Sequence, residues 1–139
     1  MLRYLLDTNT ISEPTRPAPA PHVLARLRAF TGVLAIPSLV LYELSYGCAR
    51  LAPGQRRAQI ETYITNVVLA TVPILEYDTA AALWQAAERA RLIAQGINPP
   101  FVDGQIAAIA ATQRLTLVTR NVRDFAHYQG LMVEDWFVG

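Results

Sequence analysis

Three acidic residues stand at positions where an isolated charge is unusual. Asp7 directly follows the apolar run at the N-terminus. Glu43 is the only charged residue in 33–48, and Asp103 is the only one in 92–113. An unpaired carboxylate is costly to bury in an apolar element, so each of these acids needs a partner or a chemical role.

A fourth acid, Asp124, follows the apolar run 115–119. Carboxylates that share one cleft repel one another unless a cation neutralises them. Their hard oxygen atoms suit Mg²⁺ or Mn²⁺, and a Mg²⁺ ion that keeps several waters is a good catalyst of phosphodiester hydrolysis. The two histidines, His22 and His127, stand alone in the sequence and suggest no competing metal site.

Each acid also has a structural explanation, which the sequence leaves open. Asp7 can cap the turn after its strand, and Asp124 can cap a short helix. Asp103 can be an acid that a helix macrodipole favours near its N-terminus. Glu43 can lie on an exposed helix face or pair with Arg50. A shared cation is the one explanation that accounts for all four acids at once.

The composition is that of one folded domain over residues 1–139. Apolar residues make up 53% of the chain, and no apolar run is long enough to span a membrane. The N-terminus reads as a first strand and not as a signal peptide. Cys48 is the only cysteine, which excludes an intrachain disulfide and fits a reducing cytoplasm. The net charge is +1, so the chain as a whole is no basic nucleic-acid binder, although all 12 cationic side chains are arginines.

Short apolar strands alternate with helices along the chain. The predicted strands are 2–6, 33–37, 71–75, 115–119 and 131–135. The predicted helices are 22–30, 39–51, 55–69, 79–95 and 101–114, with a proline-rich loop at 13–21 and a short helix inside 121–128. Ser38 and Asp78 are suitable N-caps for two of these helices, and Gly96 ends one of them.

This alternation predicts an α/β fold with a mainly parallel sheet. Ligands of such sheets bind at the carboxyl ends of the strands. Asp7, Asp103 and Asp124 all fall near that edge. Glu43 lies about one turn into its helix, which still reaches the edge at a rise of ~1.5 Å per residue. We therefore expect the four acids to meet there.

Other kinds of site lack their motifs. The sequence has no glycine-rich dinucleotide motif, no P-loop and no nucleophile elbow. A phospho-aspartate receiver would also place acids at strand ends. However, no adjacent pair of acids follows the first strand, and the chain has no lysine to serve that chemistry.

Four segments together resemble the PIN domain, and more narrowly its VapC-type toxins. They are LLDTNTISE at 5–13, LVLYELSYG at 39–47, VDGQIAAIAA at 102–111 and LVTRNVRDF at 117–125. The opening DTN-x-ISEP is most similar to the FitB-like branch of that group. Each motif is short, but the four occur in the family's order and each carries its acid.

The resemblance implies a three-layer α/β/α sandwich and cleavage of single-stranded or looped RNA that depends on Mg²⁺ or Mn²⁺. Asp7, Glu43 and Asp103 match three acids of the family. Some relatives carry the fourth acid where this chain has Asn121, and others carry it three residues later, at Asp124. We predict that Asp124 is the fourth acid of the site and that Asn121 is a polar site residue.

The same resemblance assigns roles to these side chains. Asp7 and Asp103 are expected to hold the metal. Glu43 is expected to complete the metal site or to orient and deprotonate the attacking water. Small polar residues that match the family would orient the acids or a water; these are Thr8, Asn9 and Thr119, with Ser38 a weaker match that an N-cap explains fully.

RNA that approaches an acidic site needs cations nearby to hold its phosphates. Arg16, Arg120 and Arg123 flank the motifs and are the candidates, although surface salt bridges are the default explanation for them. Tyr42 and Tyr46 lie one turn apart beside the predicted catalytic Glu43. They could stack on unpaired bases, but packing in the core is the simpler expectation.

The resemblance further implies a cognate antitoxin that blocks the site, and a two-fold homodimer of the toxin. Antitoxins of this kind often lay a helix in an apolar groove, for which 55–69 and 39–51 are the expected walls. DNA would be contacted only indirectly, through the antitoxin. A second possibility is a catalytically weak binding module that acts mainly in a DNA-binding complex with its antitoxin.

Overall fold

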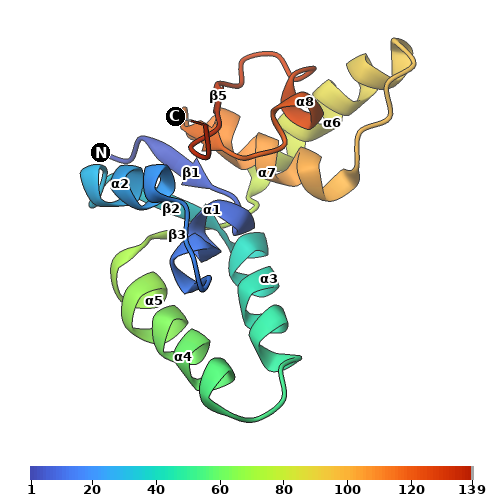
Figure 1. The fold of residues 1–139 in the computed structure, drawn as a ribbon. Coiled ribbons are helices and arrows are strands. Elements are labelled where there is room, and N and C mark those ends of the chain that lie inside the picture. The colour runs from blue at the N-terminus through green and yellow to red at the C-terminus, as the bar shows by residue number, and fades with distance from the viewer. Residues whose placement is uncertain (139) are drawn as a thin grey trace.

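Five parallel strands form the centre of the molecule in the computed structural model, which describes residues 1–138 (Figure 1). The sheet has the order β3-β2-β1-β4-β5. Its strands are β1 (Tyr4–Leu6), β2 (Leu34–Pro37), β3 (Ile74–Leu75), β4 (Thr116–Val118) and β5 (Val133–Glu134). Every neighbouring pair is parallel, which confirms the predicted sheet.

Alternate residues of the strands point into two separate cores. In β1, Tyr4 and Leu6 face one core, and Leu5 faces the other. In β4, Val118 and Leu117 divide in the same way. Because both faces of the sheet are covered, its strands are almost continuously apolar. The result is the expected α/β/α sandwich.

The helices lie on the two faces of the sheet. Those packed on the first core are α2 (Pro21–Ala29), α3 (Ser38–Ala49), α4 (Gln55–Tyr63) and the π-helical turn η2 (Ile64–Val68). Those packed on the second are α6 (Thr79–Ala94), α7 (Phe101–Thr112) and the short α8 (Val122–Phe125). The short elements α1 (Thr8–Ser12), η1 (Glu13–Thr15, a 3-10 turn) and α5 (Leu69–Thr71) complete the chain.

The ends of α6 follow the predicted capping. Asp78 caps its N-terminus, because the Asp78 side chain accepts a hydrogen bond of 2.9 Å from the backbone N–H of Ala81. At the other end Gly96 adopts a φ of 80°. The backbone N–H of Ile97 then reaches back to the carbonyl of Leu92, as in a Schellman motif.

Three local features differ from the predictions. Ser38 is the first residue of α3 and not its N-cap; Pro37 takes that place and offers no side-chain bond. The stretch after Asp7 was not predicted to be helical, yet it forms α1 and η1. The predicted helix 55–69 contains the π-turn η2 and continues through α5.

Within residues 1–138, no helix combines the length and the apolar character that crossing a membrane requires.

Candidate active site

The candidate site lies where the order of the strands reverses. From β1 the chain continues to β2 on one side, whereas β4 joins β1 on the other. In parallel sheets the crevice at such a point is the usual place for a ligand. Asp7 and Thr119 follow the two strands at that point, and the Asp7 N–H donates to the carbonyl of Val118 at 3.1 Å.

A cleft of about 180 Å³ opens at this edge. Most of its lining residues are polar, and they come from segments far apart in the sequence. They are Asp7, Thr8, Asn9, Glu43, Asp103, Ile106, Thr119, Asn121 and Phe125. The structure therefore brings together three of the four predicted acids and all four of the predicted supporting residues. The segments that carry them are the ends of β1 and β4, the first half of α3 and the start of α7; β1, α3 and α7 are labelled in Figure 1.

Asp7 is half-buried and serves two structures at once. Its Oδ1 accepts a hydrogen bond of 2.9 Å from the N–H of Thr10, so Asp7 is the N-cap of α1. The same side chain lines the cleft. The structural explanation and the chemical one are therefore compatible, because the capping bond fixes the direction of the carboxylate.

Asp103 lies in the first turn of α7 and is also half-buried. Burial raises the pKa of its carboxyl, and the negative charge of Asp124 raises that pKa further. A carboxyl whose charged form is disfavoured in this way is one that a bound cation would stabilise.

Glu43 is exposed, although the apolar sequence around it suggested burial. The reason is that α3 buries Val40, Leu44 and Cys48 in the core, with Leu39 and Leu41 packed partly against the two cores. Glu43 projects from another face of the helix into the mouth of the cleft. The structure gives it no ion pair with Arg50 within residues 1–138.

Asn121 and Asp124 occupy different positions. Thr119 is buried, and its Oγ1 accepts a bond of 3.1 Å from the N–H of Asn121, which places Asn121 on the wall of the cleft. Asp124 is exposed in α8 and does not line the cleft. Its charge nevertheless acts on Asp103.

The three candidate arginines lie outside the cleft lining. Arg16 pairs with Glu13 at 3.3 Å. The guanidinium of Arg120 lies 4.1 Å from the ring centroid of Phe137. Arg123 is exposed on α8. The structure therefore gives two of them intramolecular partners, and their contact with RNA stays a prediction.

Residues 4–131 match the PIN domain. The chain belongs to this family. It is 35% identical to the tRNA(fMet)-specific endonuclease VapC of Salmonella typhimurium, and the match covers 98% of this chain and 99% of that protein. It is 32% identical to the toxin FitB of Neisseria gonorrhoeae, covering 87% of this chain and 89% of that one. The resemblance inferred from the four motifs is thereby confirmed.

A solved structure has the same fold as this PIN domain. DNA-bound VapBC from Salmonella typhimurium matches it with a TM-score of 0.83 and 31% identity, over 98% of this chain and 99% of that one.

The PIN resemblance implies a divalent metal, and the donors in the cleft suit one. Carboxylate, hydroxyl and amide oxygens line it, and no cationic side chain is among the lining residues. Within residues 1–138, no three Asp, Glu, His or Cys side chains form a ready-made metal cage. Mg²⁺ is commonly held by one or two carboxylates while keeping several waters. The residues therefore fit a hydrated Mg²⁺ and not an ion enclosed by protein.

The sequence reasoning missed the residues that hold the first turn of α7. Gln85 is buried; it accepts a bond of 2.6 Å from the Tyr77 hydroxyl and donates one of 3.0 Å to the carbonyl of Phe101. A Cβ at Gly104 would come within 2.5 Å of the Gln85 amide nitrogen. The absence of a side chain at Gly104 therefore lets the Gln85 amide come this close to α7. From there Gln85 bonds to Phe101 and holds the turn that carries Asp103. The signal in the sequence was a glycine inside a helix, beside an acid.

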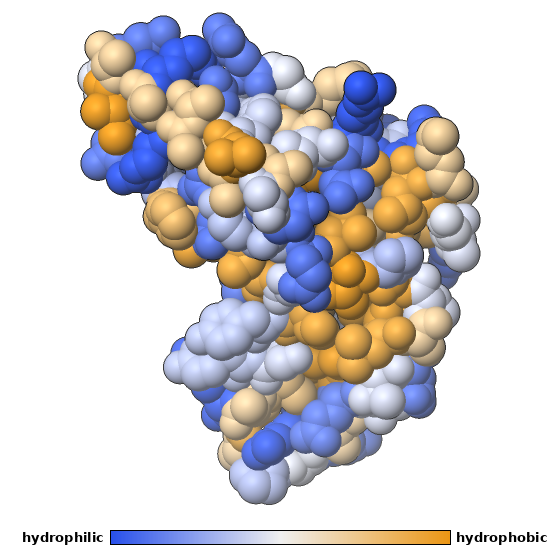
Figure 2. Space-filling model, turned by 180° about the vertical axis from the view of Figure 1, so that it is seen from behind, coloured by the Kyte–Doolittle hydropathy of each residue, from blue (hydrophilic) through white to orange (hydrophobic). Residues whose placement is uncertain are grey.

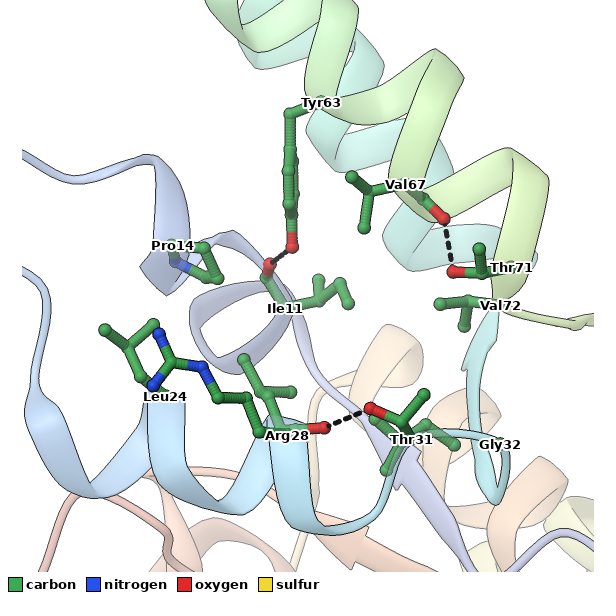
Figure 3. Close-up of a pocket in the computed structure, with 12 residues that line it drawn as sticks. Ile11, Pro14, Leu24, Arg28, Thr31, Gly32, Tyr63, Val67, Thr71 and Val72 are labelled. Atoms are coloured by element: carbon green, nitrogen blue, oxygen red, sulfur yellow. Dashed lines mark hydrogen bonds between the residues drawn. The ribbon is translucent and has the colours of Figure 1, made fainter.

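An apolar groove of about 300 Å³ lies between α2 and the α4–η2 segment, with Ile11 of α1 among its lining residues (Figure 3). Leu24, Leu27 and Arg28 of α2 form one wall, and Tyr63 and Val67 of the α4–η2 segment form the other. The Tyr63 hydroxyl donates to the carbonyl of Ile11 at 2.6 Å across its floor. The segment 55–69 is thus one of its walls, and α2 is the other. A second, smaller apolar pocket of about 180 Å³ lies between α3 and the α4–η2 segment, the two walls expected from the sequence, with Leu44 and Ile60 among its lining residues.

Proposed function

We propose that this chain is an endoribonuclease, the toxin of a VapC-type toxin–antitoxin pair, and that it hydrolyses RNA phosphodiester bonds at the acid cleft. The observation that carries the proposal is the convergence of Asp7, Glu43 and Asp103, from three distant segments, in one cleft of a PIN domain. The names of the relatives, a tRNA(fMet)-specific endonuclease VapC and a toxin FitB, support the same activity.

In this proposal Asp7 and Asp103 hold Mg²⁺, or Mn²⁺ in its place. The bound ion supplies positive charge that stabilises the charge developing on the phosphodiester. Glu43 is exposed at the mouth of the cleft, so its carboxylate can accept the proton of the water that attacks phosphorus. Asn121, held by Thr119, offers an amide that can orient that water or a phosphate oxygen.

The test is RNA cleavage by the purified protein. Initiator tRNA is the first substrate to try, because a relative is named for it. We expect cleavage with Mg²⁺ or Mn²⁺, none with EDTA, and none by Asp7→Asn even though that variant folds. Glu76→Gln is the matched control, because Glu76 is an exposed acid outside the cleft. Metal-dependent cleavage by folded Asp7→Asn would overturn the site.

The partner we propose is a cognate antitoxin. Solved neighbours are complexes of this kind, and one is described as DNA-bound VapBC. DNA would then be contacted through the antitoxin, the toxin would form a homodimer, and the pair would act in the cytoplasm, where its RNA substrate is. Intact RNA under all metal conditions, together with tight antitoxin binding, would instead support the catalytically weak binding module.

A further inference from the structure

An aromatic stripe runs along α3 beside the cleft. Tyr42 is 64% exposed and Tyr46 is 53% exposed, although both were expected to pack in the core. Their ring centroids are 5.9 Å apart, and the ring planes differ by 8°, so the rings are stacked in parallel. The guanidinium of Arg50 lies 5.3 Å from the centroid of the Tyr46 ring.

Helix geometry explains why the stripe is exposed. Val40, Leu44 and Cys48 form the buried face of α3. The stripe is displaced from that face by two residues, or about 200° around the helix, so it projects away from the core. Two large rings and a cation are thereby presented to the outside, where packing within the chain does not use them.

The stripe lies next to the acid cleft, because both include the part of α3 around Glu43. Glu43 lines the cleft and lies three residues before Tyr46, so the two side chains are neighbours on the helix surface. The residues that line the cleft include no cation. An RNA strand therefore has to be held by groups beside the cleft. Tyr42 and Tyr46 flank Glu43 on α3, and Arg50 lies one further turn along, at the end of the helix.

We propose that Tyr42, Tyr46 and Arg50 form a stacking site for unpaired bases of the RNA next to the scissile phosphate. This inference rests on the proposed ribonuclease function. Parallel aromatic faces accept any base, and an arginine beside them can bind a phosphate. The site therefore selects single-stranded or looped RNA, whose bases can leave their own stack, over duplex RNA.

The charge of the stripe favours RNA over a second copy of the chain as its occupant. Arg50 has no carboxylate within ion-pair distance in residues 1–138. In a two-fold interface the stripe would face a second copy of itself, and its three side chains would offer Arg50 no carboxylate. A polyanion instead pairs with that charge. The surface seen from behind is hollowed on the edge between α7 and α3, which leaves room for a strand to enter (Figure 2).

The test measures binding without cleavage. Fluorescence anisotropy in an Asp7→Asn background compares an unstructured oligouridine, an abasic strand of equal length and a duplex RNA. We expect the double substitution Tyr42→Leu/Tyr46→Leu to weaken oligouridine binding about tenfold or more and to leave binding of the abasic strand unchanged. Tyr42→Phe/Tyr46→Phe is the matched control and should bind normally, because it keeps both rings.

Arg50→Gln is an independent check. It should weaken binding to both single strands and reduce the dependence of binding on salt by about one phosphate contact. All variants change exposed side chains, and circular dichroism with thermal melting verifies that they fold.

Unchanged oligouridine affinity in the folded leucine variant would overturn the stacking site. A second result would also overturn it. If the leucine variant has a changed molecular mass in sedimentation but an unaltered RNA affinity per protomer, the stripe is an interface between copies of the chain. Since no cleavage is measured, these outcomes are distinct from a failure of the proposed ribonuclease activity.

Discussion

Asp7 and Asp103 each serve a helix as well as the cleft. Asp7 caps α1 through the N–H of Thr10, and Asp103 lies in the first turn of α7, where the helix macrodipole favours an acid. The local role helps to offset the cost of placing like charges close together. The structural explanations that the sequence left open, a cap for Asp7 and a macrodipole position for Asp103, are therefore compatible with the catalytic roles proposed for these two residues.

Changing the charge at positions 124 and 121 tests which of the two residues acts as the fourth group of the site. Asp124 acts on Asp103 from outside the cleft lining, whereas Asn121 lines it. We predict that Asp124→Asn raises the Mg²⁺ concentration needed for half-maximal cleavage by about two- to fivefold, as expected for an exposed charge. The rate at saturating Mg²⁺ should change little. Titrations of cleavage rate against Mg²⁺ measure both quantities.

The complementary variant is Asn121→Asp, which adds a carboxylate to the cleft wall and should lower the Mg²⁺ requirement. If Asp124→Asn instead abolishes cleavage at every Mg²⁺ concentration, Asp124 has a direct catalytic role that its position outside the lining does not suggest.

Glu88 ties α6 to the segment after α8. It pairs with Arg91 through bonds of 2.9 and 2.8 Å and accepts another of 2.8 Å from the N–H of Gln129. The hydrogen bond from Arg91 is the main cause that lowers the pKa of Glu88; burial opposes it. A lowered pKa means that this carboxylate stabilises the fold above its unfolded pKa, and that the contribution is lost as the pH falls through the folded pKa.

We predict that Glu88→Gln lowers the free energy of unfolding by about 1–2 kcal/mol at neutral pH, as for hydrogen bonds to a charged group. The difference from the unchanged protein should shrink below about pH 4, where the carboxyl of the unfolded chain is protonated. Urea denaturation at several pH values measures it. Glu61→Gln is the control, since its exposed pair with Arg57 should contribute less than about 0.5 kcal/mol.

At the scale of elements, α6 and α7 end in the same hydrogen-bonding pattern with different residues. Gly96 ends α6, and Arg114 ends α7 with a φ of 58°. The next residue, Leu115, donates its backbone N–H to the carbonyl of Ala110 at 2.9 Å, which completes a Schellman motif. A side chain in this left-handed conformation is strained, whereas glycine is not.

We predict that Arg114→Gly raises the free energy of unfolding by about 0.5–1 kcal/mol, because it relieves the left-handed strain at the end of α7. Gly96→Ala should lower it by about 1 kcal/mol for the converse reason. Thermal and urea unfolding of the two variants give both values. Destabilisation by Arg114→Gly would mean that the arginine side chain contributes more than its backbone conformation costs.

Elements with strong periodicity or an explicit cap were predictable from the sequence, and short irregular ones were not. Asp78 and Gly96 mark the ends of α6 because each acts through its own local bond or backbone conformation. Ser38 failed as a cap because the preceding Pro37 already holds the extended conformation that an N-cap requires. The π-turn η2 has no sequence signature of its own, so the helix 55–69 was predicted as uninterrupted.

The sequence predicted which residues line the cleft better than it predicted which of their side chains are exposed. A parallel sheet brings strand ends to one edge, which is why Asp7, Asp103 and Thr119 could be grouped in advance. Whether Glu43 is buried depends on which face of α3 meets the sheet, and a helix apolar on most sides does not reveal that face. The same ambiguity led Tyr42 to be expected in the core.

At the scale of the whole molecule, the acid cleft and the apolar groove between α2 and the α4–η2 segment share no lining residue. The groove is walled by α2 and by the α4–η2 segment, and Val67 on its wall is 43% exposed. An antitoxin that fills the groove with apolar side chains could bind independently of the acids. Binding and cleavage should therefore be separable by substitution.

We predict that Val67→Asp weakens antitoxin binding at least about tenfold, because docking would bury an unpaired charge in the groove. RNA cleavage by the free toxin should be unchanged. Calorimetry with the antitoxin and the tRNA assay measure the two effects, and Ile93→Asp on α6, exposed by 49%, is the matched control. Equal antitoxin affinity for both variants would place the antitoxin elsewhere, and loss of cleavage in Val67→Asp would show that groove and cleft are coupled through α1.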